Sequence, residues 1–274
     1  MSYPRIISKL TREPWCVTER VHQAMLSAIE SKLAGANVSA MEIPEDDDDD
    51  ANEPYTVKSV AVIPMKGIMG KGLSALEMEC GGCSMEEVAK ALKLAAEDDG
   101  TSAIILEINT PGGTVNGTPE LANLVADIAT RKPVFAYTET QCCSAGLWVA
   151  SQATHFYASQ SADVGSCGVR MVMLDYSRQL DREGVTVNAI SSGKYKLMGA
   201  EFKPLEKDER EMLQADSDQI HAQFKDAVTR NRAVDEKHLQ GQSFDGSTAA
   251  EIGMIDGVID DFDEVLEMAL QTGF

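Results

Sequence analysis

The chain has 274 residues, 43% of them hydrophobic, which suits one large α/β domain or one domain with appendages. Its 24 basic and 44 acidic residues give a net charge of -20. This charge repels phosphate backbones and anionic lipids, so nucleic acid is not an expected partner. No segment reaches the roughly 20 apolar residues of a membrane span, and Met1 to Arg12 lacks the apolar core of a signal peptide. The sequence therefore predicts a cytoplasmic protein without a membrane span.

The N-terminal part of the chain is expected to form a separate helical segment over residues 1–41. Thr18 can cap a helix that runs from Glu19 to about Leu33, with an apolar stripe on one face. The acidic run that includes Asp46 to Asp50 cannot pack against itself, so residues 42–54 are predicted to be a linker. The main domain is then expected over residues 55–274.

Strands and helices are expected to alternate along the main domain. Apolar and β-branched runs predict strands at 57–63, 103–108, 133–138 and 155–158, with an extended segment at 185–190. Helical patterns cover 85–98, 119–131, 144–153, 174–183, 207–231, 248–253 and 262–271. This alternation predicts an α/β fold with a mainly parallel sheet, right-handed crossovers and flanking helices.

Two loops that follow strands carry groups suited to acyl transfer, at the edge where open α/β sheets place their active sites. Gly112 and Gly113 follow a strand and can expose backbone N–H groups to an oxyanion, although an ordinary strand-to-helix turn fits the spacing as well. Ser144 begins a predicted helix, where the helix dipole favours a negative oxygen and the N–H of Ala145 is available. A plain helix cap explains most serines in that position.

A third segment, Ser192 to Lys196, offers a lysine that could take a proton from a serine if its pKa were lowered by burial. Most lysines are solvated surface charges, so this signal is weak alone. The four histidines are poorly placed for a Ser-His-Asp triad; they are His22, His155, His221 and His238.

The six cysteines are too few and too clustered for a disulfide scaffold, so reduced thiols are expected. Cys142 and Cys143 are rival nucleophiles beside Ser144, although small buried side chains are the commoner role. Cys80 and Cys83 form a single CxxC pair, which is weak evidence for zinc and favours a glycine loop with free thiols. We expect no metal and no cofactor.

Taken together, five motifs in order resemble the signal peptide peptidase A family, serine proteases of the ClpP/crotonase superfamily. The resemblance runs from about Val57 to Phe262. The motifs are Asn109-Thr110-Pro111-Gly112-Gly113, Cys143-Ser144-Ala145-Gly146-Leu147-Trp148, Val164-Gly165-Ser166-Cys167-Gly168-Val169, Ser192-Gly193-Lys194-Tyr195-Lys196 and a closing segment from Phe244 to Asp256. Thr110 and Ala145 depart from the usual serine and glycine but keep the backbone role.

The resemblance implies roles for individual residues. Ser144 would be the nucleophile and Lys196 its general base. The N–H groups of Gly113 and Ala145 would form the oxyanion hole, and Ser166 would orient the lysine. An extended peptide substrate would pair with the chain by β-augmentation, through residues Gly67, Ile68, Met69, Thr114 and Val115.

The layout of an N-terminal helical piece, an acidic linker and Glu13-Pro14-Trp15 is similar to phage and prophage members of this family, the capsid maturation proteases. These act on scaffold and capsid proteins, and the location would then be the bacterial host cytoplasm. Half-length members form rings in which the lysine can serve a neighbouring subunit, so a homo-oligomer is expected. The alternatives are a cytosolic protease of the same family that degrades peptides, a thioester enzyme of the crotonase fold and an inactive assembly scaffold.

Overall fold

The main sheet of the protein has six strands in the order β13-β10-β8-β6-β3-β2, in a computed structural model that describes residues 14–17 and 52–272. Every strand pair in this sheet is parallel except the edge pair of β2 and β3. The strands are β2 (Tyr55–Val57), β3 (Val60–Lys66), β6 (Ala103–Asn109), β8 (Val134–Thr138), β10 (His155–Ala158) and β13 (Gly257–Val258).

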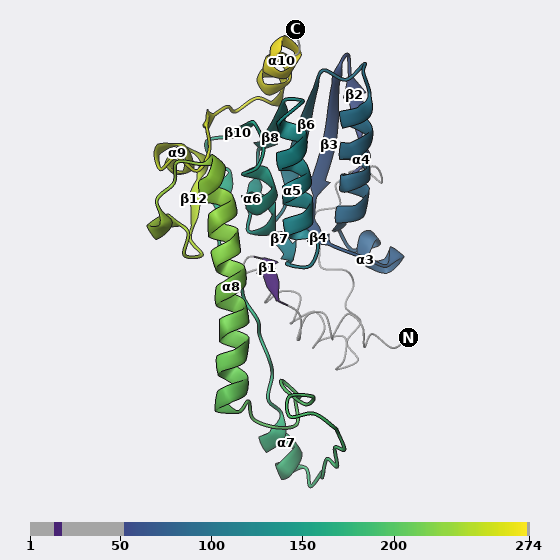
Figure 1. The fold of residues 1–274 in the computed structure, drawn as a ribbon, viewed down its shortest axis with the longest axis vertical. Coiled ribbons are helices and arrows are strands. Elements are labelled where there is room, and N and C mark those ends of the chain that lie inside the picture. The colour runs from purple at the N-terminus through teal and green to yellow at the C-terminus, as the bar shows by residue number, and fades with distance from the viewer. Residues whose placement is uncertain (1–13, 18–51, 273–274) are drawn as a thin grey trace.

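Helices cover both faces of this sheet (Figure 1). On one face lie α4 (Met85–Glu97), α5 (Thr118–Ala129) and α6 (Ala145–Ala150), and on the other lies α10 (Phe262–Thr272). The side chains of β6 alternate between the two layers, with Ile104 and Leu106 in one apolar cluster and Ile105 in the other. A strand buried on both faces must be apolar throughout, which explains the run at 103–108. The expected α/β class, with a mainly parallel sheet and flanking helices, is confirmed.

Two small sheets extend the carboxyl ends of the main strands. One has the order β1-β7-β4-β5, and the other has the order β12-β11-β9. Their strands are β1 (Trp15–Val17), β4 (Ile68–Gly70), β5 (Gly82–Ser84), β7 (Gly112–Thr114), β9 (Gln141–Cys143), β11 (Asp163–Gly165) and β12 (Ser243–Asp245). Since β4, β7, β9 and β11 follow β3, β6, β8 and β10 in the chain, all these loops meet at one edge.

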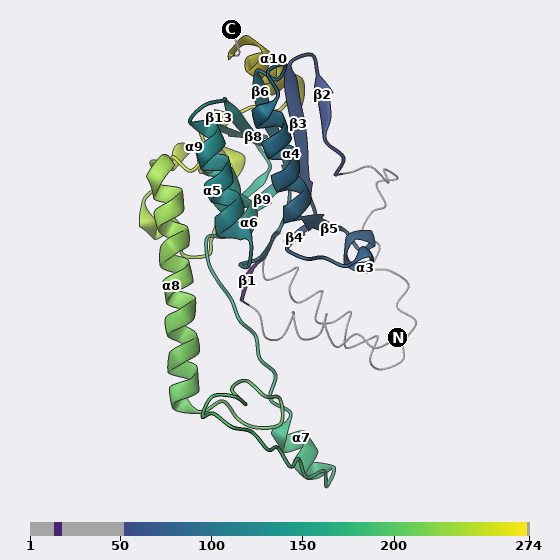
Figure 2. The same cartoon turned by 45° about the vertical axis from the view of Figure 1, so that its right-hand side comes forward.

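An arm projects from this α/β body. It consists of residues 171–206, including α7 (Ser177–Arg182), and of the first part of α8 (Lys207–Asn231) (Figures 1 and 2). The far end of α8 is anchored in the body, where Phe224 stacks on Trp148 of α6 at 4.5 Å and the Ala227 carbonyl accepts a hydrogen bond from Gln152. No helix in the described part of the chain combines the length and apolar character that a membrane crossing requires.

Most of the longer predicted elements are confirmed, with differences that have physical reasons. The expected extended segment at 185–190 forms no strand, because no other strand lies beside it in the arm; Ile190 is fully exposed. The short strands of the small sheets and α3 (Ala75–Glu79) were not predicted, because segments this short carry little signal of their own, whereas α9 (Gly246–Glu251) matches the helix expected at 248–253. The helix expected from Glu19 to Leu33 lies outside the described residues. Trp15–Val17, expected in a separate segment, pairs with the main domain.

The buried side chain of Thr110 joins the two kinds of sheet. Its hydroxyl donates to the Gly67 carbonyl at 2.6 Å and accepts from the Gly112 N–H at 3.1 Å. Its backbone N–H donates to Gln141, and its carbonyl accepts from the N–H of Cys143, the residue before Ser144. One residue therefore links the ends of β3, β6 and β8.

We expect Thr110→Val to lower the free energy of unfolding by about 1–3 kcal/mol, because it removes the partner of the partly buried Gly67 carbonyl and of the buried Gly112 N–H at constant side-chain volume. Thr110→Ser, which keeps the hydroxyl, should lose clearly less. Urea unfolding followed by circular dichroism measures both. Equal stability of the valine variant and the wild type would show that the hydrogen bonds of the Thr110 hydroxyl do not stabilise the fold.

Candidate active site

Ser144 lies on a strained turn between β9 and α6. Its φ of 54° and ψ of -113° fall in a region that residues with a side chain rarely adopt. The turn is held by the Ser144 N–H, which donates to the Gly165 carbonyl at 2.8 Å, and by the Ser144 carbonyl, which accepts from Trp148. Strain of this kind, about 1–3 kcal/mol, persists only where the surroundings enforce it, and it marks candidate functional sites.

The hydroxyl of Ser144 is buried without a hydrogen-bond partner among the described residues. The residue is 1% exposed. The Cys16 thiol lies alongside it: burial raises the pKa of this thiol to about 12, and the Ser144 hydroxyl lowers it in part, although the contact does not reach hydrogen-bond geometry. Because buried polar groups nearly always find partners, an orphaned hydroxyl calls for an explanation, and a nucleophile that awaits its base is one.

The glycines around this turn allow backbone segments to approach closely. A methyl group on Gly113 would lie 1.9 Å from the Met69 carbonyl oxygen, and one on Gly146 would lie 2.3 Å from the Thr110 side chain. A methyl group on Gly112, whose φ is 112°, would lie 2.9 Å from Ser144 Cβ. The glycine loop therefore packs directly against the serine turn, so Gly113 and Ala145 belong to the same small region as Ser144.

The two cysteines before Ser144 are unsuited to act as nucleophiles. Burial raises the pKa of Cys142 well above its usual range and that of Cys143 to about 12. A thiol reacts as its thiolate, so both groups stay unreactive near neutral pH. Cys143 instead donates to the Asp163 carbonyl at 3.4 Å, as expected for a small packing residue. All six cysteines are described, and none forms a disulfide.

The three described histidines are engaged elsewhere. His155 packs on Phe135 in the main sheet, His221 hydrogen-bonds the Leu239 carbonyl and His238 lies edge-on to Phe244. None bonds the hydroxyl of Ser144. His22 lies outside the described residues. Within the described ranges, no group of histidine, cysteine and carboxylate side chains is arranged to hold a metal ion.

Lys196 lies on the arm and not beside Ser144. The segment that joins α7 to α8 carries it at the far end of the arm, away from β9 and α6 (Figures 1 and 2). Its side chain is exposed. The structure of one chain therefore brings together Ser144, Gly113, Ala145 and Ser166 but leaves Lys196 apart.

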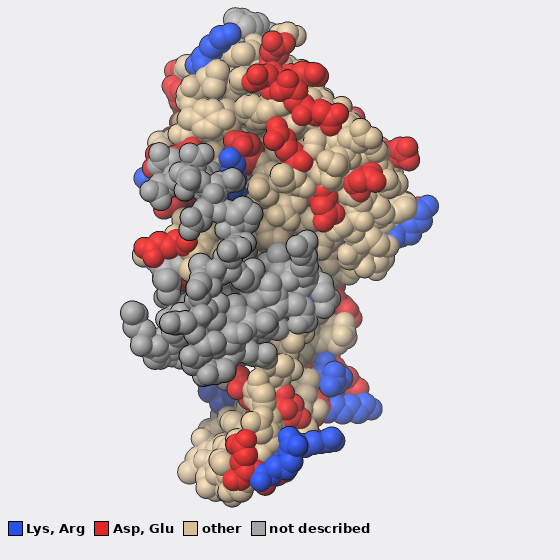
Figure 3. Space-filling model, turned by 180° about the vertical axis from the view of Figure 1, so that it is seen from behind, with Lys and Arg blue, Asp and Glu red and all other residues tan. Residues whose placement is uncertain are grey.

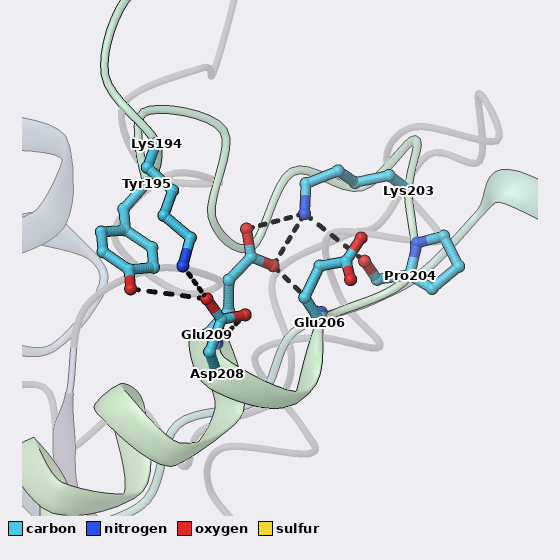
Figure 4. Close-up of polar contacts among 7 residues, drawn as sticks. All are labelled: Lys194, Tyr195, Lys203, Pro204, Glu206, Asp208 and Glu209. Atoms are coloured by element: carbon cyan, nitrogen blue, oxygen red, sulfur yellow. Dashed lines mark hydrogen bonds and ion pairs between the residues drawn. The ribbon is translucent and has the colours of Figure 1, made fainter.

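Ion pairs tie the Lys196 segment to the first turn of α8 (Figure 4). Lys194 contacts the Asp208 carboxylate at 2.5 Å, and Lys203 contacts Glu209 at 2.7 Å. Glu206 and Glu209 form a capping box at the start of the helix. The hydrogen bond to Asp208 raises the pKa of Lys194, so this amine is held as a cation and is a poor base. Lys196, in contrast, has no such side-chain partner among the described residues.

Ser166 follows the residue that holds the serine turn. Its φ is 57°, and its N–H donates to the Gln242 carbonyl at 2.6 Å. It is partly exposed, next to Gly165, whose carbonyl accepts from Ser144. Its position is therefore compatible with contact to a group that reaches Ser144 from outside.

The residues expected to bind substrate lie on β4, on β7 and just beyond β7. β4 is paired on both sides, with β5 and β7, so Gly67, Ile68 and Met69 support β7 and offer no free edge to a peptide. β7 pairs with β4 on one side and with β1 on the other. Thr114 pairs with Trp15, and the N–H of Val115 donates to the Pro14 carbonyl at 3.3 Å. Sequence reasoning missed β1, because three residues before an expected helix carry no strand signal.

Comparisons with known proteins agree with these observations. The model of peptidase family S49 matches residues 126–273, and the model of the NfeD1b N-terminal domain matches residues 59–174. Capsid assembly protease C of Escherichia phage lambda is 28% identical over 257 residues, which cover 90% of this chain and 58% of that protein. The head-tail preconnector protein of Enterobacteria phage P21 is 27% identical over 216 residues, 78% of this chain and 43% of that protein.

The chain thus spans about half the length of these curated relatives. Among solved structures, an enoyl-CoA hydratase/isomerase family protein from Silicibacter pomeroyi aligns with a TM-score of 0.44 at 15% identity over 80% of each chain. Since the S49 model covers more than half of the sequence, this chain belongs to peptidase family S49.

Proposed function

We propose that the chain is a serine endopeptidase with Ser144 as nucleophile and Lys196 as general base. The observation that carries this proposal is the buried, unpartnered hydroxyl of Ser144 on a strained turn against the glycine loop. The N–H groups of Gly113 and Ala145 would form the oxyanion hole, and Ser166 would orient the lysine. Family membership supports the reaction class.

The reaction would proceed through an acyl-enzyme. Ser144 Oγ attacks the peptide carbonyl while the neutral Lys196 amine takes its proton, and the oxyanion is stabilised by backbone N–H groups. The lysine then gives the proton to the leaving amine. Water, activated by the same lysine, attacks the ester and frees the acid. The whole route uses protein groups and water.

The separation of the two residues within one chain requires that Lys196 reach Ser144 of a neighbouring subunit. The ion pairs at the start of α8 tie the lysine segment to that end of the helix (Figure 4), and the arm projects from the body (Figures 1 and 2). Docking would also exclude water from around the exposed Lys196 amine. A homo-oligomer with active sites between subunits follows.

The surface of the arm supports contact with a second copy. Several large apolar side chains on the arm are exposed, namely Tyr176, Val185, Val187, Ile190 and Tyr195. Acidic side chains dominate the upper body on the face drawn in Figure 3. Residues 171–206, in contrast, carry no net charge, since their basic residues Arg178, Arg182, Lys194, Lys196 and Lys203 are matched by Asp175, Asp181, Glu183, Glu201 and Glu206. Such an arm can approach an acidic body without repulsion.

The substrates we propose are phage scaffold or capsid proteins. Two relatives bear phage names, a capsid assembly protease and a head-tail preconnector protein. A protease of this kind would act in the cytoplasm of the bacterial host, on unfolded or loosely folded segments that can pair with β7. General degradation of peptides by the same site is the alternative, and it would show no preference for scaffold or capsid proteins.

Cleavage of casein should fall by about a thousandfold or more in Ser144→Ala and in Lys196→Ala, since each removes a partner of one catalytic unit. Lys207→Ala, at an arm lysine whose side chain is 91% exposed, is the matched control and should keep most of the activity. Peptide release from casein is the measurement, with circular dichroism to confirm folding. Cleavage that survives in Ser144→Ala would show that Ser144 is not the nucleophile. It would favour the alternatives of a thioester enzyme and an inactive assembly scaffold.

Mixing the two inactive variants tests whether sites are shared. If Ser144 and Lys196 come from different subunits, random assembly of equal amounts leaves about a quarter of the sites with both residues intact. We therefore expect activity to return when Ser144→Ala and Lys196→Ala are refolded together. A mixture that stays inactive, although mass spectrometry shows mixed oligomers, would place both residues in one subunit.

Ile190→Asp should dissociate the oligomer, because it places a charge on a fully exposed apolar side chain of the arm. The matched control is Leu94→Asp, since Leu94 on α4 of the body is also exposed, at 61%. Analytical ultracentrifugation gives the mass of each variant, and casein cleavage should fall with dissociation. Dissociation by Leu94→Asp alone, or an active wild-type monomer, would contradict the proposed role of the arm.

A further inference from the structure

Strand β1 lies between two segments that border Ser144. On one side Trp15, Cys16 and Val17 pair antiparallel with β7, opposite Thr114, Gly113 and Gly112. On the other side the Trp15 N–H donates to the Arg170 carbonyl at 2.9 Å, and the Arg170 N–H donates to the Trp15 carbonyl at 2.9 Å. β1 therefore fills the one edge of the glycine-loop strand that β4 leaves open.

The middle residue of β1 lies against the nucleophile. A methyl group on Gly112 would lie 2.1 Å from the Cys16 carbonyl oxygen and 2.9 Å from Ser144 Cβ, so this carbonyl, the glycine loop and the serine share one small space. The Cys16 side chain is fully buried and faces the Ser144 hydroxyl. Because side chains alternate along a strand, Trp15 and Val17 point to the other face.

We propose that Pro14–Val17 occupies the position of a peptide substrate, so that the chain closes its own active site and a substrate binds only by displacing this strand. The inference rests on the proposed peptidase function of Ser144. Backbone pairing of this kind depends little on sequence, so a substrate segment can take over the bonds to β7 and Arg170. The occupant also indicates what the position beside Ser144 accepts, which is a small, weakly polar side chain.

Displacement would expose three buried side chains, since Trp15, Cys16 and Val17 are at most 4% exposed, so a substrate must bury comparable surface in their place. β1 is three residues long, and its register with β7 spans three residue pairs. If β1 leaves the edge of β7 free for only a fraction of the time, the apparent affinity for substrate equals the intrinsic affinity multiplied by that fraction. The chain would then regulate its own site without a separate inhibitor. A permanent structural strand is the competing interpretation, and it predicts that β1 stays in place when substrate binds.

The first test follows the Cys16 thiol in the Ser144→Ala chain, which cannot cut itself. β-Casein, an unfolded protein, serves as the probe, and its binding is measured by fluorescence anisotropy. We expect bound casein to speed iodoacetamide modification of Cys16 by about fivefold or more, because a displaced thiol regains its ordinary pKa and exposure. Exposed Cys80 controls for the reagent, and buried Cys142 controls for unfolding. Casein binding without faster modification of Cys16 would overturn the inference.

The second test weakens β1 itself. Trp15→Pro removes the N–H that donates to Arg170, and Trp15→Phe is the matched control that keeps it. If the groove is open in about a tenth of wild-type molecules, Trp15→Pro should bind casein about tenfold more tightly, and kcat/KM should rise by the same factor.

The outcomes of these tests distinguish the proposed peptidase function from the inference that β1 occupies the substrate position. Wild-type cleavage of casein without a gain in a folded Trp15→Pro variant would overturn this inference alone. Weaker casein binding by that variant would show that β1 is part of the binding surface and would overturn it too. Failure of every variant to bind or cut casein would remove the peptidase proposal and this inference together.

Discussion

The hydroxyl of Thr110 sets the geometry on which the candidate site depends. Parallel strands end at one edge of a sheet, but that edge alone does not fix how the following loops lie. Thr110 fixes them by bonding Gly67 after β3, Gly112 after β6 and, through its backbone, the residues around β9. Gly146 packs so closely on this side chain that any larger residue there would collide with it. The serine turn and the glycine loop are therefore positioned by one buried residue.

The strain at Ser144 can be understood from this arrangement of loops around Thr110. The turn costs free energy because a serine adopts a positive φ, and the hydroxyl forgoes the hydrogen bond that a buried group normally makes. The surrounding bonds to Gly165 and from Trp148 compensate for that cost. Both penalties would be removed by placing a solvated serine on a regular helix. The turn thus costs stability that a regular helix would keep.

The sequence predicts the elements whose signal is local. The buried run of β6 and the periodic pattern of α8 are strong patterns, and the structure has them within a residue or two of the expected bounds. The strands of three residues were missed, because so short a segment is defined by its partners and not by its own composition. The prediction of an extended segment at 185–190 was wrong for the opposite reason: its residues favour a strand, but no partner strand lies beside it in the arm. Pairing in space decided both cases.

The sequence likewise predicted only part of the candidate site. Motif order was enough to bring Ser144, Gly113 and Ala145 into one hypothesis, and they are neighbours in the structure. The motif of Lys196 carried no information about distance, and the residue lies on an arm that extends away from its own body. The sequence also could not predict that β1 pairs with the edge of β7, since the pairing of Cys16 with Gly113 joins residues almost a hundred positions apart.

The distant position of Lys196 and the pairing of β1 with β7 both bear on Ser144. If Ser144 is the nucleophile and Lys196 the base, as proposed, a single folded subunit would be inactive, because Lys196 lies on the arm and β1 lies beside Ser144. Activity would require docking of a neighbour's arm and displacement of β1, and the two events involve different elements of the fold. Two independent requirements multiply: if each is met by a tenth of molecules, about one in a hundred is active. Assembly and substrate together would then complete the proposed site, with the arm bringing Lys196 and the substrate replacing β1.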